Sequence, residues 1–76
     1  MPGRLPSLDR DEVIRALKRA GLRVIREGGN HTVLWREGLP RPVPVRRHKG
    51  TMRRGQVRAI ISQAGLTVDE FIELLR

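Results

Sequence analysis

The chain has 76 residues, enough for one small domain and too few for a nucleotide-binding half joined to a substrate-binding half. Cysteine is absent, which excludes thiol nucleophiles, disulfides and cysteine-bound zinc, and no apolar stretch is long enough to span a membrane. The net charge of +8, from 16 Lys and Arg against 8 Asp and Glu, favours a polyanionic partner, nucleic acid first. With no apolar leader at its start, we expect a cytoplasmic protein of one domain, residues 1–76, without a cofactor.

The first predicted element is a helix over residues 10–20. Residues 1–8 contain two prolines and a glycine, which predict an irregular lead-in. Asp9 and Glu12 have the spacing of a capping box, in which each side chain bonds a free backbone N–H. Gly21 is placed to end the helix. Between these signals, apolar residues recur at helical spacing, namely Val13, Ile14, Leu17 and Ala20.

Three short β-like segments follow, at residues 22–27, 31–36 and 42–47. Gly28, Gly29 and Asn30 join the first two segments, and all three residue types take positive φ readily, which favours a turn. Pro44 lacks the N–H that a central strand needs. We therefore expect the third strand at an edge of the sheet.

Two more helical segments complete the chain. One begins near Gly55 and ends at Gly65, and Thr67 and Glu70 form a second capping box that opens a short last helix. Three sequential strands joined by short turns predict an antiparallel meander, with the two main helices on one face. The predicted fold class is α+β, like a double-stranded-RNA-binding domain, with the order α-β-β-β-α and a further short helix at the end.

Basic residues gather in the second half of the chain. Residues 41–58 contain seven cations and no acid: Arg41, Arg46, Arg47, Lys49, Arg53, Arg54 and Arg58. Such a run attracts phosphates, and its binding to nucleic acid weakens as salt rises. The alternative is a stretch that only keeps the chain in solution.

The two histidines are the candidates for proton transfer. A metal-free ribonuclease uses the 2′-hydroxyl of RNA as its nucleophile, and needs a base for it, a proton donor for the leaving 5′-oxygen and cations around the phosphate. Histidine suits both proton roles because its ordinary pKa is about 6.5. His31 follows the glycine turn and His48 lies within the basic run, although both also fit ordinary surface positions.

Metal catalysis is a weaker hypothesis. A two-metal nuclease needs carboxylates that converge on one point. The acidic cluster of Asp9, Asp11 and Glu12 sits at a helix start, where capping already accounts for it. We therefore expect no metal site.

Trp35 is the other residue with two interpretations. Strand alternation places it on the same face as His31, with Thr32 and Leu34 on the opposite face. It could stack on an RNA base. We favour a contact with the core or with a partner protein.

Three stretches of the chain resemble the HicA (YcfA-like) toxin family. Asp9–Leu22 resembles the family's first helix, Gly29–His31 stands in the place of its Gly-Ser/Thr-His signature, and Arg53–Leu66 is similar to its basic stretch ending in Gln-Ala-Gly-Leu. The tail, Thr67–Leu75, also fits the family's usual ending. Each motif is short, but their order and separation cover nearly the whole chain and make the combination fairly specific.

The resemblance implies the toxin of a type II toxin–antitoxin pair, an endoribonuclease that cuts messenger RNA. It implies neutralisation by a HicB-type antitoxin that covers the active site. It assigns catalysis to His31, with Gly29 placing that histidine. The cations that we expect to hold phosphate are Arg46, Arg47, Lys49, Arg53 and Arg54.

The chain departs from the family at three positions. Thr32 stands where many members have a second histidine, Asn30 where Ser or Thr is usual, and Gln56 where Thr is common. The missing second histidine leaves the general acid unassigned, with His48 or a neighbouring arginine as alternatives.

Two other functions would use the same fold and charge. A non-catalytic RNA-binding module needs no histidine, and a partner-binding protein would present its basic face to an acidic antitoxin. DNA binding through the helix at residues 55–65 is disfavoured, because the central strands do not fit a helix-turn-helix arrangement.

Overall fold

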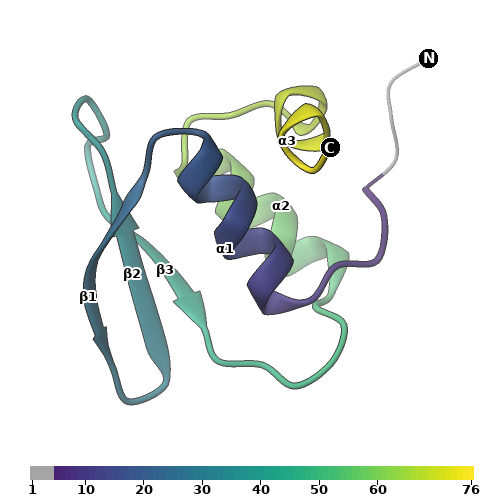
Figure 1. The fold of residues 1–76 in the computed structure, drawn as a ribbon, viewed down its shortest axis with the longest axis horizontal. Helices are drawn as coiled ribbons and strands as arrows, with labels where there is room; N and C mark the ends of the chain where they lie inside the picture. Colours follow the sequence, from purple (N-terminus) through teal and green to yellow (C-terminus); the bar gives the residue numbers. More distant parts are fainter. Residues whose placement is uncertain (1–4) are drawn as a thin grey trace.

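The structure is a computed structural model that describes residues 5–76. Its elements follow the predicted order (Figure 1). They are α1 (Arg10–Arg19), β1 (Arg23–Gly28), β2 (His31–Trp35), β3 (Val43–Arg46), α2 (Arg54–Gln63) and α3 (Val68–Leu74). Of the predicted lead-in, residues 1–4 lie outside the described part, and residues 5–8 form no helix or strand.

Both predicted capping boxes are confirmed. At α1, the Asp9 carboxylate accepts a hydrogen bond from the Glu12 N–H at 2.8 Å, and the Glu12 carboxylate accepts one from the Asp9 N–H at 3.1 Å. At α3, Thr67 and Glu70 make the same pair of bonds, at 3.1 and 2.8 Å. Because a helix start leaves these N–H groups free, each cap contributes about 1 kcal/mol and fixes where its helix begins.

The element boundaries differ from the predictions by one residue at most ends. Helix α1 ends at Arg19, and β1 is shifted one residue toward the C-terminus. Helix α2 starts at Arg54 rather than Gly55, because the Gln56 side chain accepts a hydrogen bond from the Arg53 N–H at 3.3 Å and caps the preceding turn.

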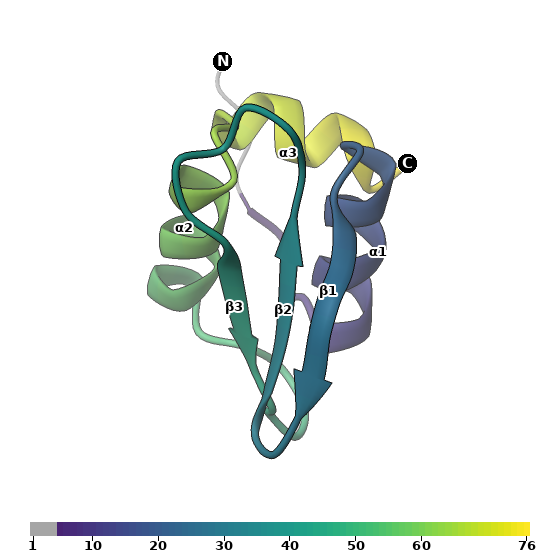
Figure 2. The same ribbon diagram turned by 90° about the vertical axis from the view of Figure 1, so that its left-hand side faces the viewer.

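The three strands form one antiparallel sheet in the order β1-β2-β3. Strand β3 lies at an edge, as Pro44 predicts, and β2 is central. The helices cover one face of this sheet and leave the other face open (Figures 1 and 2). The predicted meander with helices on one face is therefore confirmed.

The core lies between the sheet and the helices. Its largest fully buried side chains are Phe71 of α3, Leu17 of α1, Leu34 of β2 and Ile61 of α2. Strand β3 alternates between buried and exposed residues, with its two valines facing the core. Pro44 and Arg46 therefore project from the open face.

A bulge interrupts β1. The pairing of β1 with β2 passes from Val24 to Arg26 without using Ile25. Arg26 consequently pairs with Val33, which shares a face of the sheet with His31. The bulge thus brings a cation to the open face near His31.

The molecule has two distinct ends (Figure 2). One, which we call the turn end, holds the β1–β2 turn, the first residues of α1 and the chain that leaves β3. The other, which we call the α3 end, holds α3 and the β2–β3 loop. Among residues 5–76, no helix combines the length and apolar character that a membrane crossing requires.

Candidate active site

Gly29 makes the β1–β2 turn and so places His31 at the first position of β2. Its φ of 56° lies in the left-handed region that favours glycine. The predicted turn is confirmed, and Gly29 alone of its three candidate residues takes positive φ, since Gly28 lies in β1 opposite His31. The Arg47 N–H donates to the Asn30 carbonyl at 2.6 Å, which ties the turn to the chain after β3.

The His31 side chain is exposed on the open face of the sheet. Its neighbour Thr32 is buried on the opposite face, as strand alternation predicts. In the sheet register, His31 lies opposite Gly28 on β1 and Arg46 on β3. Because Gly28 has no side chain, the imidazole is accessible from the β1 side.

Two shallow hollows meet at His31. The first is bounded by the β1–β2 turn and by two arginines from distant parts of the chain, Arg10 of α1 and Arg47 after β3. The second lies on the open sheet face, where Arg26 and Val33 line it together with His31. The candidate catalytic histidine therefore stands among guanidinium groups, which suit phosphate oxygens in charge and shape.

A buried hydroxyl next to His31 links a cation to an anion. Thr32 is the one buried polar residue among residues 5–76, with 1% of its surface exposed. Its Oγ1 accepts a hydrogen bond from Nη2 of Arg10 and donates one to Oε1 of Glu27 at 3.0 Å. Thr32 points to the face opposite His31, so these bonds hold Arg10 on the helix side of the sheet, at the rim of the first hollow that His31 also lines.

Three of the predicted phosphate-binding cations lie at or near His31. Arg46 is opposite His31 in the sheet, and Arg47 lines the first hollow. Lys49 lines a neighbouring hollow that shares Arg47 with the first.

Arg53 and Arg54 lie apart from His31. Both are exposed at the start of α2, and neither lines a hollow that His31 lines. The first turn of α2 carries no acid, so these cations and the free N–H groups there attract anions separately from His31. The basic run therefore does not converge on a single point.

His48 lies in the neighbouring hollow with Lys49. Its Nδ1 is buried and has no hydrogen-bond partner among the described residues. Arg10 and Arg47 line this hollow as well as the first one at His31. The two histidines thus border adjacent hollows that share two arginines.

Trp35 is half-buried and packs against the edge of the core, although it shares the open face with His31. Its indole N–H donates to the Leu39 carbonyl at 3.0 Å, and the Arg23 guanidinium lies 5.4 Å from the ring centroid. These contacts agree with the core interpretation, and they occupy a ring face that a base would need for stacking.

The acidic cluster is engaged in local structure. The carboxylates of Asp9 and Glu12 cap α1, and Asp11 lies 3.7 Å from Arg10. Within the described range, residues 5–76, no three His, Asp or Glu side chains are grouped so as to hold a metal ion.

Two site residues escaped prediction, Arg10 and Arg26. Arg10 carried a usable signal, because a cation at the first position of a helix opposes the helix dipole and needs another reason to be there. Arg26 carried none, since its face is set by a bulge that strand alternation does not reveal.

One comparison with known proteins identifies a family. Residues 10–66, more than half of the chain, match the family model described as the HicA toxin of bacterial toxin-antitoxin. The matched range includes all the predicted site residues. No curated protein matches the chain.

Proposed function

The chain belongs to the HicA family, toxins of bacterial toxin–antitoxin pairs, and on this premise we propose that it is an endoribonuclease that cuts messenger RNA with His31 and without a metal ion. The observation that carries the proposal is the exposed position of His31 between two hollows lined by arginines.

The chemistry follows from the groups at this position. The 2′-oxygen of RNA attacks the adjacent phosphorus, the bond to the 5′-oxygen breaks, and the products are a 2′,3′-cyclic phosphate and a 5′-hydroxyl. His31 takes the proton of the 2′-hydroxyl or gives one to the leaving oxygen. Arg46 and Arg47 supply N–H donors and positive charge, so their role is to neutralise the charge that grows on the phosphate.

We assign the cations away from His31 to RNA binding. Arg53 and Arg54 lie beyond the two hollows and would hold flanking phosphates of the strand. We propose that the partner is an antitoxin of HicB type that covers His31 through an acidic surface, because a chain of charge +8 favours an acidic partner. The cytoplasm, where messenger RNA is present, is the proposed location.

A non-catalytic RNA-binding module is the second candidate. The separation of Arg53 and Arg54 from His31 favours it, since those cations bind phosphate whether or not His31 reacts.

Cleavage of a long single-stranded RNA in excess chelator separates the two functions. The comparison uses wild-type protein, His31→Ala and His48→Ala, purified by one procedure, so that a contaminating ribonuclease would appear in all three. We expect wild-type cleavage and a fall of at least about 100-fold in His31→Ala, because loss of a general acid or base costs that much. Alanine at an exposed position should leave folding intact.

The other outcomes have definite meanings. RNA binding without cleavage by all three proteins would favour the binding module. Wild-type rates in His31→Ala would overturn the assignment of His31. A loss in His48→Ala as well would give the second proton transfer to His48.

A further inference from the structure

Helix α1 begins with a cation in a position that suits an anion. Arg10 is the first residue of the helix, where the dipole is positive, and Asp11 and Glu12 of the same turn offset the resulting repulsion. Its charge therefore does not serve the helix. The side chain instead leaves the helix layer and reaches the sheet.

The Arg10 guanidinium is fixed by a buried anchor. Nη2 donates to the Thr32 hydroxyl, which in turn donates to the Glu27 carboxylate on β1. Because Thr32 is buried and held within β2, its hydroxyl holds the guanidinium in a fixed position. A guanidinium held in this way loses little freedom when it binds a ligand.

The anchor leaves only the Nη donors of Arg10 free. A guanidinium has five N–H donors; the bond to Thr32 uses one on Nη2, and the Nε donor is buried without a partner among the described residues, so three remain on Nη1 and Nη2. Asp11, 3.7 Å from Nη1, is 81% exposed and competes weakly. The Arg10 side chain is 23% exposed, and it lines the hollow that His31 and Arg47 also line. The remaining Nη donors are therefore available to an anion in that hollow.

We infer that Arg10 binds the scissile phosphate of RNA next to His31 and stabilises the negative charge of the transition state, with Thr32 and Glu27 as its positioning residues. This inference rests on the proposed ribonuclease function. Thr32, which stands where many family members have a second histidine, thus supports a cation and takes no part in proton transfer. Partial burial strengthens the interaction, because water screens the charges less.

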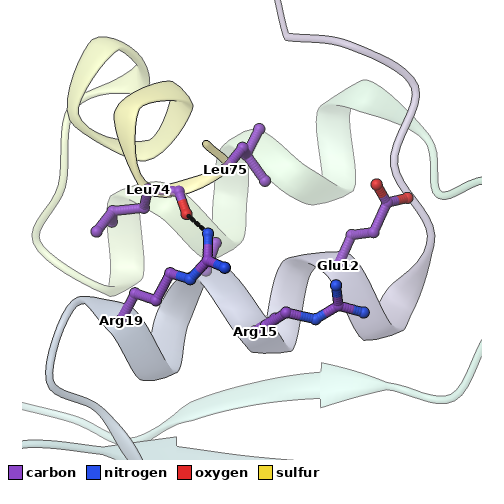
Figure 3. A pocket seen from close by; sticks show the side chains of 6 residues that line it. Glu12, Arg15, Arg19, Leu74 and Leu75 are labelled. Carbon is purple, nitrogen blue, oxygen red and sulfur yellow. Dashed lines mark hydrogen bonds between the residues drawn. The ribbon is translucent and has the colours of Figure 1, made fainter.

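The main test compares Arg10→Ala with Arg15→Ala. Arg15 is an exposed arginine of the same helix, and it extends toward Glu12 in a different hollow, which α3 also lines (Figure 3). Both variants lose one positive charge from α1. Single-turnover cleavage should fall about 100-fold in Arg10→Ala, as for other donors to a developing oxyanion, and stay at the wild-type rate in Arg15→Ala. Arg10→Lys should recover part of the rate, since lysine keeps the charge and loses the fork.

Binding is measured separately with RNA that carries 2′-O-methyl groups throughout. This RNA lacks the nucleophile and cannot be cut by the proposed route. Loss of one phosphate contact should weaken its binding less than about tenfold, so the larger effect falls on the chemical step. Equal losses in rate and in binding would overturn the transition-state role of Arg10.

Thr32→Val tests the anchor. Valine has nearly the shape of threonine and removes both hydrogen bonds without changing Arg10 itself. Cleavage should fall about tenfold through misplacement of the guanidinium. The double variant Arg10→Ala/Thr32→Val should be no slower than Arg10→Ala alone, because the anchor has nothing left to hold. Additive losses would contradict the positioning role of Thr32.

Thermal unfolding and the 2′-O-methyl RNA keep the test valid if a variant is unstable. An unfolded variant loses its unfolding transition and its RNA binding together, and Arg10→Lys then decides the question. Cleavage by Arg10→Ala within about threefold of Arg15→Ala would overturn this inference while leaving the ribonuclease intact. Absence of cleavage by the wild-type protein would instead overturn the proposed function and, with it, this inference.

Discussion

The turn end and the α3 end use the same residue types for different purposes. At the α3 end, Arg19 donates to the carbonyls of Leu74 at 2.8 Å and Arg76 at 2.6 Å, and so closes the C-terminus of α3 (Figure 3 shows the first bond). At the turn end, Arg10 of the same helix is held by one side-chain hydroxyl and lines a hollow. Arg19 therefore donates to the backbone and stabilises the fold, whereas Arg10 keeps Nη donors for a ligand.

Glycines show the same contrast. Gly29 and Gly38 both have positive φ, 56° and 93°. Gly29 makes the turn that precedes His31, and Gly38 lies in the β2–β3 loop at the α3 end (Figure 2). Residue type and net charge therefore do not separate structural from functional positions in this chain, and the contacts of each side chain do.

The pair Gly29→Ala and Gly38→Ala should show the largest difference between the two ends. Alanine in the left-handed region costs about 1–2 kcal/mol, so both variants should lose similar stability in thermal unfolding. Only Gly29→Ala should also lose cleavage, by about tenfold, because the relaxed turn moves His31. Equal cleavage by the two variants would remove the functional distinction between the two ends.

A smaller effect is expected when Arg53 and Arg54 are both changed to alanine. Two phosphate contacts to a single strand account for a salt-dependence slope of about 1.4, so the slope of affinity against salt should fall by that amount. Cleavage at saturating RNA should not change. The matched control is Arg15→Ala/Lys18→Ala, which removes the same charge from exposed positions of α1. A reduced cleavage rate at saturation would place Arg53 or Arg54 in the catalytic step.

Arg19→Ala should leave activity unchanged and affect only folding. Loss of the bonds to the backbone oxygens of Leu74 and Arg76 should cost about 1 kcal/mol and lower Tm by about 5 °C. Arg15→Ala, which has no such bonds among the described residues, should keep the wild-type Tm. A loss of cleavage in folded Arg19→Ala would show that the α3 end takes part in function.

Local signals in the sequence predicted the secondary structure and the faces of the strands. Asp9 with Glu12 and Thr67 with Glu70 marked two helix starts, because capping depends on neighbouring residues. The turn and the alternation along β2 likewise predicted that β2 begins at His31 and that His31 and Thr32 lie on opposite faces, since both are short-range effects.

The assembly of the site depends on contacts that sequence spacing does not contain. Arg10 reaches Thr32 only because α1 packs across the sheet, and Arg26 faces outward only because of the bulge at Ile25. The basic run identified the cations but did not predict which of them lie near His31. The path of the chain after β3 carries Arg53 away from His31.

The most direct test of the central claim is the chemistry of the RNA ends that the protein produces in chelator. If His31 assists attack by the 2′-hydroxyl, wild-type protein must leave 2′,3′-cyclic phosphate and 5′-hydroxyl ends, and His31→Ala must leave neither above background. Ends with a 5′-phosphate and a 3′-hydroxyl, or the cyclic phosphate formed equally fast by His31→Ala, would contradict the account.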